Sequence, residues 1–127
     1  MMKRMLGTAV TLGCFLIIVA CAARTPSSTV ESFYRAVEKG DSEAAVEFLH
    51  PNFVKMMGEE KLRAGISEYA LNLKEKGGIK DLEVKEDSVA GEAARVTAVL
   101  KYGDGTQETE KHALVKENGR WYIKPEK

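Results

Sequence analysis

The repeat of hydrophobic and polar positions changes once along the chain, close to residue 78. Before that point, apolar residues recur every three or four positions, which is the spacing of one helix face. Glycine or proline follows each of the three segments that show this spacing, and both residues commonly end helices. We therefore expect three helices, from about residue 26 to 39, from about 42 to 50 and from about 59 to 76.

The start of the first predicted helix carries two local signals. Thr25 is a residue type that caps helices, and Pro26 follows it at the position where a helix tolerates proline best. Ser28 and Glu31 have the spacing of a capping box, in which each side chain bonds to the other residue's backbone. These signals place the start of the helix between Thr25 and Ser28.

After residue 78, apolar and polar residues alternate, which predicts β-strands with one covered face. The clearest run is 94–102, between a weaker strand near residue 82 and a hairpin turn at Gly103–Gly105. A long polar segment from Thr106 to Lys116 follows, and Asn118-Gly119 is a second hairpin signal before a last strand. The sequence therefore predicts an α+β fold, with about three N-terminal helices packed on a curved four-stranded antiparallel meander.

The first 21 residues resemble the export signal of a bacterial lipoprotein. Lys3 and Arg4 form a positive end, an uncharged apolar run follows, and Cys21 stands after the small residue Ala20. The resemblance implies cleavage before Cys21 and acylation of its sulfur and its new amine with long chains such as palmitate. At ~0.8 kcal/mol per buried CH₂, several such chains hold a protein on a membrane. We expect a signal peptide at 1–20 and an acylated tether at 21–28.

Two other interpretations of this segment stay open. Cys14 is a second candidate for the lipid acceptor, although Thr11 stands where an aliphatic residue is usual. Alternatively, the uncharged stretch of 19 residues from Met5 to Ala23 has the length of a membrane-spanning helix. Both alternatives leave the remainder tethered on the non-cytoplasmic side, with the positive end inside.

Charge and cysteine content narrow the classes of partner and cofactor. The chain has 19 basic and 19 acidic residues, and losing residues 1–20 removes Lys3 and Arg4 to leave 17 basic residues against 19 acidic ones. Both signs are interleaved, without the basic stripe that nucleic acid requires, so we expect no nucleic-acid partner. With Cys14 removed and Cys21 acylated, the domain has no thiol for a disulfide or a zinc ion. We expect no metal and no cofactor.

Eight segments from residue 26 onward carry a resemblance to known proteins: Pro26, Phe33–Ala36, Gly40-Asp41, Leu49–Pro51, Lys74–Ile79, Val96–Val99, Tyr102–Thr106 and Leu114–Trp121. In this order they resemble a family of short bacterial lipoproteins of unknown function. Their domain is nuclear-transport-factor-2-like (lumazine-binding-like), and the resemblance implies a cone with a cavity at its open end, formed here by residues 29–127. Members of that superfamily include enzymes and non-catalytic binding modules, so the fold alone does not decide the function.

Few side chains are candidates for chemistry. His50 is expected at a helix end, where a ring nitrogen meets a free carbonyl. His112 lies in the polar third strand and is expected to face solvent or the sheet edge. Asp104, between two glycines, is expected to form a turn, since no second carboxylate lies at calcium-loop spacing. Tyr34 and Tyr69 are candidates to offer hydroxyls to the cavity from helices.

The remaining candidates for ligand contact are apolar. Met56 and Met57 follow Phe53 and Val54 and are expected to pack between helices or to border the cavity mouth, where methionine adapts to varied ligands. The expected inward strand positions are aliphatic or small, which favours a greasy or filled cavity over a reactive one.

The sequence therefore favours a non-catalytic function. We expect a lipid-anchored envelope protein that binds a small apolar ligand or a protein partner near the membrane through Tyr34, Tyr69, Met56 and Met57. One alternative is a small acid-base isomerase or hydrolase of the same fold. Another is a homodimer that serves envelope assembly through its open sheet face. Ala22 after the acylated cysteine favours the outer membrane, facing the periplasm, in a Gram-negative host.

Overall fold

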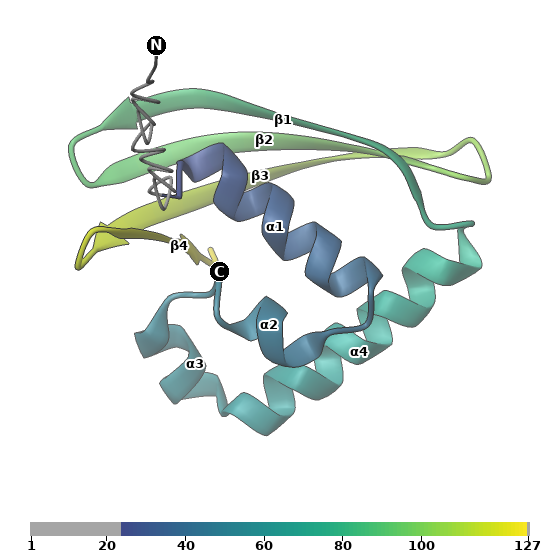
Figure 1. Ribbon diagram of the computed structural model, residues 1–127, viewed down its shortest axis with the longest axis horizontal. Helices are drawn as coiled ribbons and strands as arrows, with labels where there is room; N and C mark the ends of the chain where they lie inside the picture. The colour runs from purple at the N-terminus through teal and green to yellow at the C-terminus, as the bar shows by residue number, and fades with distance from the viewer. Residues whose placement is uncertain (1–23, 127) are drawn as a thin grey trace, which may run out of the picture.

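Four helices precede a four-stranded antiparallel sheet in the computed structural model, which describes residues 24–126 (Figure 1). This confirms the predicted α+β class and meander, whose strand order is β1-β2-β3-β4. The signal peptide predicted at residues 1–20 and the predicted lipid acceptor Cys21 lie outside the described residues. The elements are α1 (Pro26–Glu38), α2 (Ser42–Val46), α3 (Pro51–Met57), α4 (Glu59–Glu75), β1 (Ile79–Ala90), β2 (Ala93–Tyr102), β3 (Gln107–Glu117) and β4 (Arg120–Lys124).

The helix α3 was missed in the sequence, where Pro51 was interpreted only as the end of the preceding helix. Proline is also favoured in the first turn of a helix, because its missing N–H is not needed there. His50 caps α3 by accepting a hydrogen bond at Nδ1 from the Asn52 amide, at 3.3 Å. Gly58, at φ 90°, then separates α3 from α4.

The capping box at the start of α1 involves a different pair from the one predicted. Thr25 is the N-cap, its hydroxyl accepts from the Ser28 amide at 3.0 Å, and Ser28 Oγ accepts from the Thr25 amide at 2.8 Å. Glu31 therefore has no part in this box. The first turn, Pro26–Ser28, lies inside the range that the sequence assigned to the tether, so helical structure begins close to Arg24.

The core lies between α1 and the concave face of the sheet, which we call the inner face (Figure 1). On α1, Val30, Tyr34 and Val37 are buried at helical spacing. The segment Phe48–His50 runs along the free edge of β4, where the His50 amide donates to Ile123 O at 2.9 Å. The inner residues of β2 are all buried and alternate as predicted: Ala94, Val96, Ala98, Leu100 and Tyr102.

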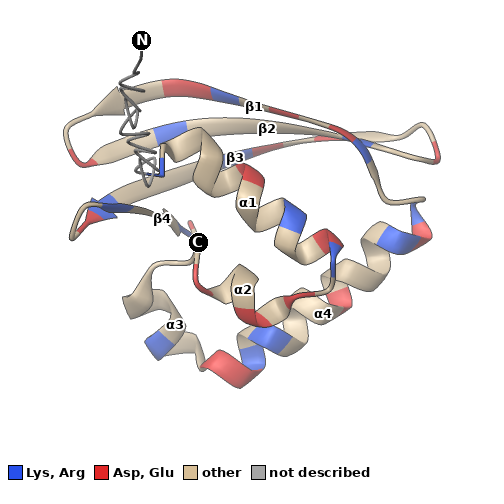
Figure 2. Ribbon diagram, viewed as in Figure 1, with Lys and Arg blue, Asp and Glu red and all other residues tan. Residues whose placement is uncertain are grey.

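Charged side chains of both signs are spread over the helices and the sheet (Figure 2). Among the helices of residues 24–126, none is both long enough and apolar enough to cross a bilayer.

The turn between β2 and β3 packs against the connection from α4 to β1 at very close range. The Gly103 amide donates to Gly78 O at 3.0 Å, and the Asp104 amide donates to Lys76 O at 2.9 Å. A Cβ on Gly103 would lie 2.5 Å from Gly77 O, closer than real atoms approach. We call this contact the glycine joint, and it leaves no space for a side chain at position 103.

We expect the substitution Gly103→Ala to lower the free energy of unfolding by about 1–3 kcal/mol, as overpacking usually does. The matched control is Gly65→Ala, in the exposed interior of α4, where an added Cβ meets no atom within 4 Å. The control should stabilise the protein by up to about 1 kcal/mol, through helix propensity. Urea unfolding of both variants checks this, and equal midpoints would contradict the close packing at the glycine joint.

Candidate functional site

The inner face of β3 is polar, which corrects the expectation that inward strand positions are aliphatic or small. Residues directly opposite each other on antiparallel strands share a face. Glu108 lies opposite Leu100, Glu110 opposite Ala98 and His112 opposite Val96, and these three β2 residues are buried inside. The available sequence signal was Leu114, because stepping back from this apolar residue by twos gives His112, Glu110 and Glu108.

His112 faces the core, where it contacts α1, and so it does not face solvent or the sheet edge as expected. Its Nε2 lies 2.7 Å from the hydroxyl of Tyr34, which is only 2% exposed. Burial lowers the pKa of His112 and raises that of Tyr34, so both groups are neutral near pH 7. With the imidazole proton on Nδ1, the Tyr34 hydroxyl donates to Nε2, and with the proton on Nε2 the ring donates to the hydroxyl oxygen.

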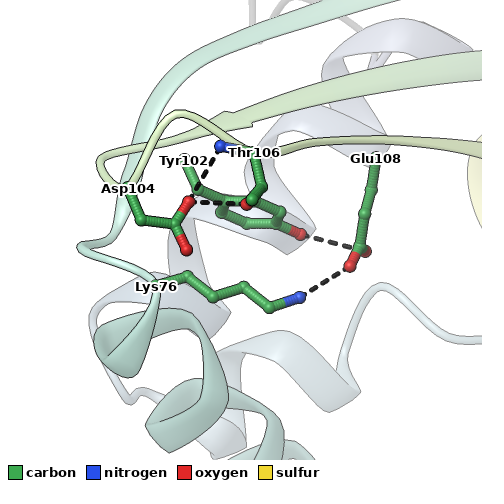
Figure 3. A network of polar contacts seen from close by, with 5 residues as sticks. All are labelled: Lys76, Tyr102, Asp104, Thr106 and Glu108. Atoms are coloured by element: carbon green, nitrogen blue, oxygen red, sulfur yellow. Dashed lines mark hydrogen bonds and ion pairs between the residues drawn. The ribbon is translucent and has the colours of Figure 1, made fainter.

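At the end of the molecule near the glycine joint, Glu108 accepts from two side chains (Figure 3). Lys76 Nζ lies 2.6 Å from Oε1, and the Tyr102 hydroxyl donates to Oε2 at 3.1 Å. The hydrogen bond with Lys76 is the main cause that lowers the pKa of Glu108 and raises that of Lys76. Burial is the main cause that raises the pKa of Tyr102.

The third tyrosine, Tyr69 of α4, packs against the core that contains Tyr34 and Tyr102. It is half-buried, and burial raises its pKa. It is close enough to Tyr34 and Tyr102 to raise their pKa values as well. The structure thus brings together Tyr34 and Tyr69, the two tyrosines expected at a ligand site. We call the set the polar row; its members are Tyr34, Tyr69, Tyr102, Glu108, Glu110 and His112.

The two methionines expected near a ligand are exposed on α3, Met56 by 70% and Met57 by 36%. Their neighbours Phe53 and Val54 are partly buried and pack against the core instead. The structure therefore places the polar row and these methionines on different elements.

The other two candidate residues have local partners. His50 caps α3 through Nδ1, rather than meeting a free carbonyl at a helix end, and its Nε2 pairs with Glu117. Asp104 forms the expected turn, accepting from the amide and hydroxyl of Thr106 at 2.9 and 2.6 Å (Figure 3). Hydrogen bonds with Thr106 are the main cause that lowers the pKa of Asp104.

The chemistry of the polar row follows from which of its atoms reach solvent. Tyr34 and Tyr102 are 2% and 1% exposed, and both hydroxyls already bond within the row. Tyr69, Glu108 and His112 are half-buried, and Glu110 is exposed. Within residues 24–126, no group of three His, Cys, Asp or Glu side chains is placed to hold a metal ion. The half-buried members and the exposed Glu110 instead present a hydroxyl, two carboxylates and an imidazole to a molecule that donates hydrogen bonds.

Comparisons with known proteins give a family and a fold. The model of a domain of unknown function (DUF4878) matches residues 19–124. No curated protein matches the sequence.

Two solved structures share the architecture. One, from Campylobacter jejuni, is described as a "Putative NTF2-like transpeptidase"; it has 17% identity, a TM-score of 0.71, and coverage of 80% of this chain and 99% of that one. The other is a SEC-C motif containing protein from Rhodopseudomonas palustris, with 22% identity, a TM-score of 0.58, and coverage of 81% and 77%. At these identities the likeness shows the fold alone, which is the nuclear-transport-factor-2-like fold.

We expect the stability of the protein to fall when the pH drops from 7.5 to 5.5. The folded state lowers the pKa of His112 below the ordinary value of 6.5, so below about pH 6.5 the unfolded chain binds more protons. The stabilising effect is therefore complete above that pH and is lost toward the lower pKa of the folded state.

Urea midpoints at the two pH values measure this effect. The variant His112→Gln keeps an acceptor for the Tyr34 hydroxyl but does not titrate, so its midpoint should change less than that of the wild type. An equal change in both proteins would show that His112 is not held neutral by burial.

Proposed function

Because the chain belongs to the family of the domain of unknown function DUF4878, we propose a function for it from its own residues. We propose that it is a lipid-anchored protein of the cell envelope whose domain binds a small ligand at the polar row without transforming it. In a Gram-negative host it would lie on the outer membrane and face the periplasm. The observation that carries the binding role is that three tyrosines from three elements meet two carboxylates and a neutral imidazole on one face.

The anchor is supported by the sequence of the first 21 residues, from the positive end at Lys3 and Arg4 to Cys21. Helix α1 begins at Pro26, so only a few residues separate Cys21 from the fold. At ~3.5 Å per residue, the chain between Cys21 and Arg24 reaches no more than about 10 Å. The domain would therefore stay next to the membrane surface.

Binding rather than catalysis is supported by how the acid and base groups of the row are used. A general acid or base must reach the proton that it transfers. The Tyr34 hydroxyl is buried and bonded to His112, while Glu108 is shared by Lys76 and Tyr102. These groups therefore already bond to one another. The bonds hold their side chains in fixed positions, which suits recognition of a ligand.

A second function, the acid-base isomerase or hydrolase, is favoured by one observation. His112 is neutral on the inner face, and a tyrosine hydroxyl 2.7 Å away is a potential proton donor. In this alternative, His112 would accept a proton from a bound substrate through Nε2 once Tyr34 turned away.

We expect native mass spectrometry to find a small molecule on the full-length protein extracted from its host membrane in a neutral detergent. The variant Tyr69→Ala should lose that molecule, because it removes a half-buried ring and hydroxyl from the row. The control is Leu71→Ala, on the same helix, which removes a side chain that is 63% exposed. A wild-type protein without a ligand, or a ligand that both variants retain, would contradict binding at the polar row.

The same extract separates binding from catalysis. Unchanged recovery of the molecule after incubation with wild-type protein supports a binding module. Conversion by the wild type but not by His112→Gln would instead establish the enzyme.

We expect Cys21→Ser to abolish incorporation of labelled palmitate and to move the protein from the membrane to the soluble fraction. The serine hydroxyl is a far weaker nucleophile than the thiol that normally takes the lipid. Cys14→Ser is the matched control and should remain acylated and membrane-bound. Palmitate incorporation that survives in Cys21→Ser would overturn the proposed anchor.

A further inference from the structure

The ammonium of Lys76 occupies a small site formed by a carboxylate and an aromatic face (Figure 3). Nζ lies 2.6 Å from Glu108 Oε1 and 4.7 Å from the centroid of the Tyr102 ring. Glu108 is fixed in turn by the Tyr102 hydroxyl at 3.1 Å. A negative oxygen beside the face of an aromatic ring is the arrangement by which proteins bind organic cations.

The occupant is joined to the site by a flexible side chain. The Lys76 backbone is held at the glycine joint, where its carbonyl accepts from the Asp104 amide at 2.9 Å. Its side chain is 37% exposed, and that of Glu108 is 38% exposed. The ammonium can therefore leave for water by rotating about side-chain bonds, while the backbone and the other site residues stay in place.

We propose that Lys76 is an internal occupant of a binding site for an organic primary ammonium ion, which replaces the Lys76 ammonium at Glu108 and Tyr102. This inference rests on the proposed function and specifies the class of its ligand. Since the Nζ to Oε1 contact is a hydrogen bond, the ligand must carry N–H donors. A quaternary ammonium ion has none and would fit the ring but not the carboxylate.

The polar row extends the site beyond the ammonium. Glu110 is two residues from Glu108 on the same face of β3, and Tyr69 of α4 packs against the core that contains Tyr102. A ligand longer than the ammonium group would pass over the half-buried Tyr69 ring. The additional contact lets such a ligand compete with an occupant whose local concentration is high because it belongs to the same chain.

The position of the site in the fold favours a soluble ligand over a lipid headgroup of the anchoring membrane. Arg24, where the described chain begins, donates to Trp121 O at 3.4 Å, at the end of the sheet with the β3–β4 turn. The end of α4 and the start of β3, which carry Lys76 and Glu108, lie at the opposite end beside the β2–β3 turn (Figure 1). The 11 residues of β3 separate these ends by about 35 Å.

The test is isothermal titration of n-butylammonium chloride into the full-length protein in dodecyl maltoside. If Lys76 fills the site nine-tenths of the time, Lys76→Met should bind the probe about tenfold more tightly than the wild type. Lys74→Met, the control on the last turn of α4, should bind like the wild type. Glu108→Gln should not bind, although its amide oxygen still accepts from Tyr102. If Lys76→Met does not fold, Lys76→Gln replaces it.

Several outcomes would overturn the inference. Lys76→Met that binds the probe no more tightly than the wild type would show that the lysine is only a structural partner of Glu108. Equal binding of n-butylammonium and 1-butanol would show that the cation is not recognised.

A parallel arm separates the ligand sources and the two proposals. Tighter binding by Lys76→Met to vesicles of phosphatidylethanolamine than to vesicles of phosphatidylcholine, without binding of free n-butylammonium, would overturn the soluble source. A co-purified ligand that is lost from Tyr69→Ala but unaffected by Lys76→Met would leave the proposed function standing and reject the role of Lys76.

Discussion

The glycine joint is the contact on which the arrangement of the candidate site depends. It fixes the β2–β3 turn against the end of α4 at a distance that only glycine permits at position 103. As a result, Lys76 from the helical half faces Tyr102 and Glu108 from the sheet half. Two backbone hydrogen bonds across the joint, at 2.9 and 3.0 Å, hold the end of α4 and the β2–β3 turn together. The other end of the polar row is set by α1, which carries Tyr34 to His112.

The inner face of the sheet combines two surfaces with different tasks. Along β2 it is apolar from Ala94 to Leu100, and α1 packs on it with Val30 and Val37. Along β3 it is polar from Glu108 to His112, and burying such groups is costly unless each has a partner. Tyr34 joins the two surfaces, because its ring lies in the core while its hydroxyl satisfies His112. The core and the site are therefore not separable, and changes at Tyr34 would affect both.

Local signals in the sequence predicted the class of the fold, the four strands and most of the helices. Period and turn residues act over a few positions, so the hairpins at Gly103–Gly105 and Asn118-Gly119 were identified directly. Pro51 was interpreted wrongly because a proline is compatible both with the end of one helix and with the start of the next. The inner face of β3 was missed for a related reason, since a strand with charges on both faces shows no period of two.

The site itself was predicted only in part, because its contacts join distant segments. Tyr34 and Tyr69 were expected at a ligand site from their places on helix faces. Their partner His112 is 78 residues from Tyr34, and Glu108 is 32 residues from Lys76, so neither pair leaves a local pattern. A charge on a polar strand is usually solvated, and the sequence alone does not show which charges the fold turns inward.

The ion pair between Lys76 and Glu108 decides how a cationic ligand would gain affinity at this site. The Glu108 side chain is 38% exposed and has lost part of its water, which costs free energy unless a cation or a hydrogen-bond donor replaces that water. An internal lysine at Glu108 removes that cost while the site is empty, and a ligand that brings its own ammonium removes it equally well. Binding then exchanges one ion pair for another and returns the lysine to water. Net affinity comes from what the ligand adds beyond its charge, which makes the half-buried Tyr69 the source of selectivity.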